Sequence, residues 1–271
     1  MSIEKFYVKK DSEDEFEISE KVPGIEAMGI TKIAPQLTPQ VHQIVGSDGE
    51  FDYGSFYAPT TMKAKFYLAG SDVYDYKLLV SALNRALYSR NLIRVHDEVE
   101  PSIVYYVHVK PFAITPINFS NGVAEVEFIN PSGFRQSIVN SDQISGYNQV
   151  GMNLPDKPIT YQFTTNSFQV YNPSDVTIDP YMNNHQFKMT LRCNGTPTIT
   201  NQTTNTEIAI TSQISTDHTY VLNGVDSYLD SNAYGINTDL GYLTLAKGWN
   251  DINITGATNI SVIFSFPFLY L

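Results

Sequence analysis

Histidines are the side chains best suited to proton transfer or metal binding, and this sequence scatters them singly. They are His42, His96, His108, His185 and His218. Isolated histidines are more often surface or core residues than catalytic ones. The sequence also contains no nucleophile motif, phosphate-binding glycine loop, dinucleotide fingerprint or paired metal-ligand spacing. We therefore predict no catalytic residue, no metal site and no cofactor, and we expect a protein that is not an enzyme.

Acidic residues group in two short stretches, Asp48–Asp52 and Asp97–Glu100. Their carboxylates could in principle serve as oxygen ligands for a hard cation. The first stretch, however, lacks the regular alternation and the terminal bidentate glutamate of a calcium-binding loop, so a solvated turn is favoured. No pair of carboxylates stands out for glycoside hydrolysis either, which disfavours a peptidoglycan hydrolase.

The only tryptophan, Trp249, is followed by Asn250 and Asp251. An exposed aromatic ring can stack on a sugar while neighbouring polar groups orient the hydroxyls, so these three residues are a candidate saccharide contact. The alternative is a hairpin turn, in which Gly248 and Asn250 take the turn positions and Trp249 covers the core. The turn is favoured, and both interpretations stay open from the sequence.

Length and charge limit the class of protein. A chain of 271 residues is long enough for two domains, each with its own core. Its 17 Lys and Arg against 28 Asp and Glu give a formal net charge of −11. Proteins that grip nucleic acid need clustered basic residues to neutralise phosphates. DNA is therefore not expected as a bound partner.

Targeting and redox signals are equally limited. The stretch Met1–Val8 lacks the apolar core of a signal peptide, and no apolar run approaches the roughly 18 residues of a membrane span. We expect synthesis in the cytoplasm and no membrane partner. The single cysteine, Cys193, ends the alternating stretch Phe187–Cys193, which predicts a buried thiol on a strand.

Composition changes near residue 140. Asn and Thr become abundant beyond it, and the basic residues that remain there are Lys157, Lys188, Arg192 and Lys247. The turn-rich stretch Asn130–Gly133, followed by polar residues, is typical of a connection between two units. We expect two domains, 1–140 and 141–271.

The first domain has the pattern of an α+β fold. Met62–Leu68 alternates apolar and polar residues as a half-buried strand does, and a helix follows it, capped by Ser71 or Asp72 and ending near Arg90. The helix has an apolar stripe at three- and four-residue steps, formed by Tyr76, Leu79, Val80, Leu83, Ala86 and Leu87.

Further strands follow the helix. They are predicted at Ile93–Val95 and Ile103–Val109, and the turn Ser120–Gly122 leads into Val123–Phe128. The Asn-Gly pair in this turn predicts a hairpin. One helix among antiparallel strands indicates an α+β unit.

The second domain contains no helical stripe. Short strands are predicted at Ile159–Phe163, Phe187–Cys193, Ile208–Ile210 and Tyr242–Leu245. The chain closes with the alternating stretch Ile260–Phe268, in which Pro267 suggests an edge or a strand end. This pattern is typical of a β-sandwich.

Three regions together have an order and spacing seen in one known family. The first is Gly46–Phe51 with the strand and helix after it, and the second is Tyr105–Val109 with the hairpin ending at Phe128–Pro131. The third region is the C-terminal series Val170–Pro173, Ile178–Pro180, Leu222–Gly224, Leu243–Leu245 and Lys247–Asn250. In these features the chain resembles the distal tail (Dit) proteins of long-tailed, siphovirus-type bacteriophages of Gram-positive bacteria. The segment up to about Leu37 is less family-like, and its role, strand pairing or an arm, stays open.

The resemblance implies a fold and a function. The fold would be an α+β N-terminal domain, an antiparallel sheet or sandwich with one helix and a long β-hairpin, followed by an all-β galectin-like jelly-roll sandwich. The protein would be a structural virion protein of the tail tip or baseplate, a homohexameric ring with stacking of rings left open. Its partners would be the tail-tube protein, the tail-associated hub protein, and receptor-binding or other baseplate proteins. The tape-measure protein and DNA would pass through the ring, and an acidic lumen would not trap DNA.

Four aromatic residues, Phe51, Tyr53, Phe56 and Tyr57, lie on a loop-like stretch. A monomer has little reason to expose four rings, so they are candidates for a contact with a neighbouring subunit. The alternative is a hairpin packed on its own core. A different function also stays open, an adhesion module whose C-terminal sandwich binds host cell-wall saccharide through Trp249.

Overall fold

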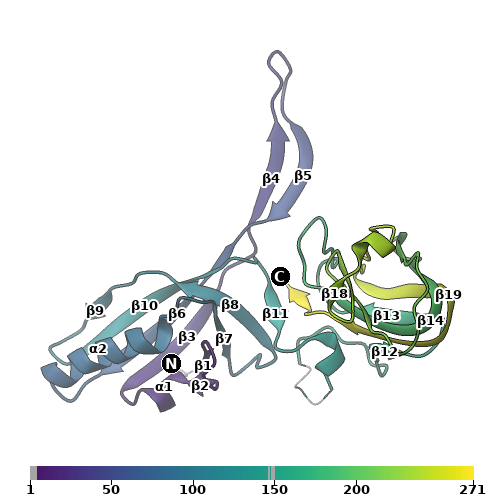
Figure 1. Ribbon diagram of the computed structural model, residues 1–271. Helices are drawn as coiled ribbons and strands as arrows, with labels where there is room; N and C mark the ends of the chain where they lie inside the picture. Colours follow the sequence, from purple (N-terminus) through teal and green to yellow (C-terminus); the bar gives the residue numbers. More distant parts are fainter. Residues whose placement is uncertain (1–4, 146, 148–149) are drawn as a thin grey trace. The chain divides into compact units, whose positions relative to one another are not determined.

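A computed structural model describes residues 5–145, 147 and 150–271 (Figure 1). The chain divides into two units, Met1–Gln136 with Leu271, and Ser137–Tyr270. The structural division follows Gln136, and the sequence expectation places it at residue 140. The fold class is confirmed, an α+β first unit followed by a β-sandwich.

The first unit contains most of the helical structure. Its elements are β1 (Phe6–Lys9), β2 (Phe16–Glu17), α1 (Ile18–Lys21), β3 (Ile25–Lys32), β4 (Leu37–His42), β5 (Phe51–Tyr57), β6 (Thr60–Ala69), α2 (Val73–Leu87), β7 (Ile93–Asp97), β8 (Ile103–Val109), β9 (Ile114–Pro116), β10 (Asn121–Asn130) and, at the boundary, β11 (Arg135–Ser137).

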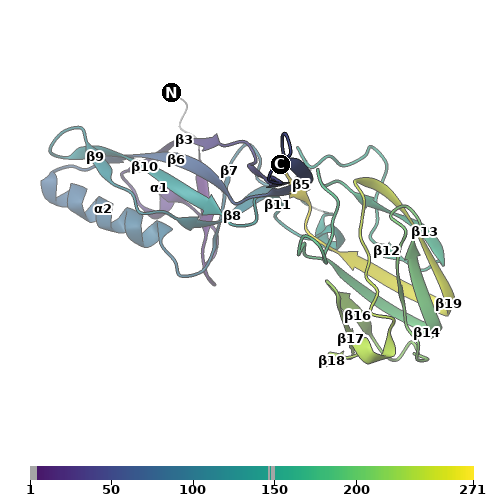
Figure 2. The same cartoon turned by 90° about the horizontal axis from the view of Figure 1, so that it is seen from above.

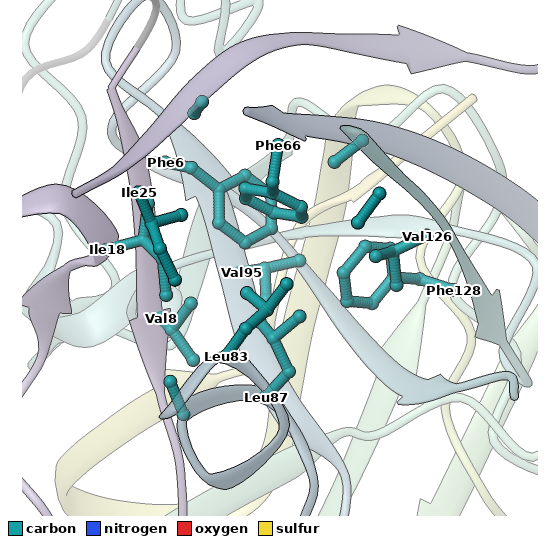
Figure 3. Packing of buried hydrophobic residues seen from close by; sticks show 14 of the residues in the cluster. Phe6, Val8, Ile18, Ile25, Phe66, Leu83, Leu87, Val95, Val126 and Phe128 are labelled. Carbon is teal, nitrogen blue, oxygen red and sulfur yellow. The ribbon is translucent and has the colours of Figure 1, made fainter. Parts of the chain in front are cut away.

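The main sheet of the first unit curves around its core. Its strands follow the order β2-β1-β7-β8-β10-β6-β3, with antiparallel neighbours. Strands β1 and β6 are far apart in this order, yet the rings of Phe6 and Phe66 meet edge to face with centroids 5.2 Å apart. Phe6 also contacts Phe128 of β10, at 5.8 Å. The sheet must therefore bend until strands from its two ends share one core (Figure 3).

Helix α2 closes this core as the sequence predicts. The Asp72 carboxylate caps its start by accepting hydrogen bonds of 2.8 Å from the amides of Tyr74 and Asp75. Leu83 and Leu87 of the apolar stripe are completely buried beside Val95 (Figure 3). The helix ends at Leu87, short of the predicted Arg90.

Strand β10 confirms the predicted alternation and corrects the predicted turn. Ala124, Val126 and Phe128 are buried, while Glu125 is exposed and Glu127 is half-buried, ion-paired to Lys63 at 2.8 Å. The hairpin with β9 exists, but Asn121 and Gly122 are the first residues of β10 and not its turn. The turn is closed instead by the Asn118 side chain, which accepts from the amides of Ser120 and Asn121.

The N-terminal segment is part of this fold. Phe6 and Val8 of β1, Ile18 of α1 and Ile25 of β3 are all completely buried in the same core (Figure 3). Up to β3, therefore, the acidic segment pairs and packs within the unit.

The second unit is an antiparallel sandwich. Its elements are a 3-10 turn at Ser141–Gln143 and the strands β12 (Gln162–Phe163), β13 (Ser167–Asn172), β14 (Lys188–Asn201), β15 (Thr206–Ala209), β16 (Tyr220–Asn223), β17 (Asp226–Leu229), β18 (Asn232–Ala233), β19 (Gly248–Ser265) and β20 (Leu269–Tyr270), with a second 3-10 turn at Gly235–Asn237.

Two long strands, β14 and β19, run antiparallel along this unit and are interrupted by bulges near Cys193 and Gly195. Beyond the bulges they pair with different partners: β13 and β15 at one end, and β12 and β16 at the other. Bulges bend strands, so the two halves of the ribbon can contribute to both layers of a sandwich (Figure 2). Cys193 is completely buried on β14, as predicted.

Two strand predictions need correction. Of the predicted strand Ile159–Phe163, only Gln162 and Phe163 form β12. In Tyr242–Leu245 the two leucines are buried as a strand predicts, but Thr244 is buried too, and the segment forms no strand and makes only an isolated bridge between Leu245 and Ile178. Strand β19 ends at Ser265, so Pro267 does lie just beyond a strand end.

Candidate assembly surface

The residues that could perform chemistry lie apart. No group of three or more His, Cys, Asp or Glu side chains within the described part of the chain is arranged to hold a metal ion. His96 is buried, stacks on Tyr7 with centroids 4.8 Å apart, and lies 3.3 Å from a Glu15 oxygen. Its Nδ1 lies 2.7 Å from the carbonyl oxygen of Asp97. These contacts give the ring a structural role in the first unit.

The acidic stretch Asp97–Glu100 is used within the fold. Asp97 accepts hydrogen bonds from the amides of Val99 and Glu100, which closes a turn. The Glu100 carboxylate pairs with Lys32 and, at 2.8 Å, with Arg135. Turn closure and ion pairing account for the carboxylates of Asp97 and Glu100.

The candidate saccharide contact is only partly available to a ligand. Trp249 is 37% exposed and its ring lies 4.9 Å from that of Tyr171. Asp251 is exposed and accepts a hydrogen bond of 2.8 Å from Gln169. Asn250, however, is completely buried, so its assignment as a saccharide contact is wrong. Gly248, Trp249 and Asn250 are the first three residues of strand β19, which corrects the alternative of a hairpin turn.

Asn250 belongs instead to a set of three completely buried asparagines, with Asn172 and Asn201. The Asn250 Oδ1 accepts from the Ala246 amide at 2.8 Å and from Asn201 Nδ2 at 3.0 Å, and its Nδ2 donates to the carbonyls of Ala246 and Gly248. Asn172 and Asn201 donate to the carbonyls of residues 245 and 244. Asparagine side chains thus supply hydrogen bonds to the backbone of residues 244–248, which a neighbouring strand would otherwise supply.

The four aromatic residues of the first unit lie on a hairpin, the form that the sequence leaves open as an alternative, but this hairpin does not pack on a core of its own within the described structure. Strands β4 and β5 form a separate two-stranded sheet that pairs with no other described strand, and every residue of both strands is exposed. We call residues 37–57, the two strands and their connecting turn, the arm. Figure 1 shows the arm projecting from the sheet of its own unit.

The aromatic side chains of the arm are open to solvent. Phe51 is 50%, Tyr53 71%, Phe56 49% and Tyr57 38% exposed. These four residues lie on strand β5, where the sequence suggests a loop-like stretch. Among the described residues, Tyr57 at the base of the arm is the one of these four that makes a ring contact, with Phe134 at a centroid distance of 4.9 Å. The arm does not pack on a core of its own within the described structure.

Cross-strand pairing places apolar groups on both faces of the arm. Phe56 lies opposite Thr38 and Phe51 opposite His42. Thr38 and His42 are four residues apart on β4, so these two phenylalanines share one face. By the same argument, Leu37, Val41 and Tyr57 share the other face. Neither face is covered.

The arm also carries acidic residues without any lysine or arginine to balance them. It contains Asp48, Glu50 and Asp52 and no lysine or arginine. The Asp52 carboxylate accepts a hydrogen bond of 2.8 Å from the Gly54 amide, where a bulge interrupts the ladder. Gly46 and Gly49 of the connecting turn have φ of 89° and 77°, values that favour glycine. The arm is therefore an apolar, acidic ribbon with two open edges.

None of the helices in the described part of the chain has the length and apolar character needed to cross a membrane.

Comparisons with known proteins give a consistent result. Residues 6–130 match the family model of the phage tail protein RIFT-related domain. The crystal structure of SPP1 Dit, described as a paradigm of the hub adsorption apparatus in phages infecting Gram-positive bacteria, superposes with a TM-score of 0.68 at 11% identity, covering 97% of this chain and 99% of that chain. Chains of the phage p2 baseplate in its activated conformation also match at 9% identity and a TM-score of 0.43, with Sr (97% of this chain, 98% of that chain) and with Ca (98% of each). No curated protein sequence matches.

Proposed function

We propose that this protein is a structural subunit of the tip of a long-tailed phage tail. The match of residues 6–130 to the family model of the phage tail protein RIFT-related domain supports this proposal. The fold that the chain shares with SPP1 Dit also supports the resemblance to distal tail proteins. Subunits close into a hexameric ring that joins the tail tube to the tail-associated hub and to receptor-binding or other baseplate proteins. Binding between subunits, not catalysis, is the mechanism.

The arm carries this proposal. An isolated two-stranded hairpin is at best marginally stable in water, and this one exposes apolar side chains on both faces. A neighbouring subunit that covers the arm would bury those side chains and satisfy its open edges. When the arm of one subunit meets a different surface on the next, the contact is heterologous, and its repetition by rotation closes a ring.

The net charge fits the same role. DNA that leaves through a ring must slide without being held, and a chain of net charge −11 offers no excess of basic groups to hold it. Location in the virion at the tail tip, after synthesis in the host cytoplasm, follows from the same proposal.

The test combines solution mass with negative-stain imaging of the purified chain over a range of concentrations. We expect rings whose population rises with concentration. Phe51→Ser with Phe56→Ser should weaken assembly at least tenfold, because two exposed rings would no longer supply apolar area for the neighbouring subunit to bury. Ile236→Ser, a matched control at a 94% exposed position of the second unit, should leave assembly unchanged. A wild-type chain that stays monomeric throughout would contradict the proposal.

A further inference from the structure

Helix α2 has an outer face that nothing covers in the described structure. Tyr74 is 76% and Leu78 66% exposed, and they lie four residues apart, one turn above the other. Lys77 and Arg85 are exposed on the same helix and have no ion-pair partner among the described residues. The outer face of α2 is therefore apolar and basic.

The arm has the complementary character. Its three carboxylates, Asp48, Glu50 and Asp52, have no ion-pair partner among the described residues, and the arm contains no basic side chain except His42. An apolar, acidic ribbon and an apolar, basic helix face thus lie in the same unit, each exposed. Opposite charges that flank apolar groups on two surfaces favour their association and fix its register.

The two surfaces also match in length. Strand β5 has seven residues, which span about 24 Å at the rise of an extended chain. Helix α2 has 15 residues, which span about 22 Å. The arm can therefore lie along the whole helix.

The contact cannot form within one chain in the observed conformation. Figure 1 shows the arm directed away from the sheet that α2 covers. Pairing of two arms is disfavoured because both ribbons are acidic and would repel each other. A second copy of the chain, offering its α2 face, is the occupant that satisfies both charge and apolar exposure.

We propose that the arm of one subunit docks on the outer face of α2 of its neighbour, with Tyr74 and Leu78 against the arm's apolar side chains and with Lys77 and Arg85 facing its carboxylates. This inference rests on the proposed function and names the contact by which the ring closes. One subunit's arm and the next subunit's helix are different surfaces, so the contact is heterologous, as ring closure requires.

Mixing single-cysteine chains tests the contact directly. Cys193 is completely buried and its pKa is raised to about 11 by burial, so the native thiol should stay unreactive in the folded protein. A tagged Tyr53→Cys chain mixed with an untagged Leu78→Cys chain should give a mixed cross-linked dimer after mild oxidation. The same tagged chain mixed with Tyr181→Cys, an equally exposed position of the second unit, should not.

Charge reversal provides a second readout. Lys77→Glu with Arg85→Glu should lower the yield of the mixed dimer about tenfold, since two attractive pairs become repulsive. Adding Glu50→Lys and Asp52→Lys on the arm chain should restore the yield. Far-ultraviolet circular dichroism of each variant confirms that it folds.

The outcomes separate the two proposals. If arm substitutions abolish the rings while no cross-link forms to α2 and charge reversal has no effect, the arm docks elsewhere and this inference is overturned, although the ring stands. If the wild-type chain forms no rings and no cross-link appears, both proposals fall.

Discussion

Replacement of Asn250 by alanine should severely destabilise the second unit. Two donors lose their acceptor, the half-buried Ala246 amide and one proton of the completely buried Asn201 side chain. The carbonyls of Ala246 and Gly248 also lose a donor. Each buried unsatisfied group costs about 1–3 kcal/mol, so we expect a loss of roughly 3–5 kcal/mol in the free energy of unfolding. A typical domain has only about 5–15 kcal/mol in total.

Urea unfolding monitored by Trp249 fluorescence measures this loss, because the only tryptophan lies next to Asn250 and reports the second unit. The midpoint should fall while the slope with denaturant stays the same. Asn183→Ala makes the same chemical change at an exposed position and should cost less than about 0.5 kcal/mol. A loss below about 1 kcal/mol for Asn250→Ala, with an unchanged slope, would refute the role assigned to the buried asparagines.

Two further predictions concern the first unit. Gly122→Ala should cost about 1–3 kcal/mol, because the added methyl group would overlap the Tyr76 hydroxyl, and Tyr76→Phe should recover part of the urea midpoint if this contact is the cause. Burial alone would raise the pKa of Glu15, but the hydrogen bond from Arg94 and the charges of His96 and Arg94 outweigh it and lower that pKa. The resulting stability is present above the unfolded-state pKa and is lost as pH falls through the folded one, so Glu15→Gln should flatten the fall in urea midpoint on acidification; an unchanged pH profile would contradict this.

The parts of the fold that follow local pattern are predictable from the sequence. Three patterns each correspond to burial against a single core: the alternation in Met62–Leu68, the alternation in Val123–Phe128 and the apolar stripe on α2. In each of them the apolar residues occupy the buried positions. The cap at Asp72 is similarly local, because its partners lie two and three residues away. Such features need no knowledge of the rest of the chain.

The parts that depend on distant partners are not predictable in this way. Asn250 next to Trp249 suggests a polar surface, but its partner Asn201 comes from another strand, β14, and only the fold shows that Asn250 is buried. Leu243 and Leu245 are buried as a strand predicts, yet asparagine side chains replace the ladder. The arm is predicted only in part for a related reason: the aromatic residues leave open a contact with a neighbouring subunit and a hairpin on its own core, and only the fold shows a hairpin that stays uncovered.

The bulge in the arm has a consequence for how the free subunit survives before assembly. A hairpin with two open edges is a template onto which further strands could add without limit, which is the route to fibres. The irregularity between Pro39 and Val41 interrupts the regular hydrogen-bond ladder that such growth requires. Asp52, which lies opposite Val41 at this irregularity, adds a negative charge that disfavours the pairing of a further strand. The arm is thus poorly suited to open-ended strand addition, and it can still bind one partner of complementary shape.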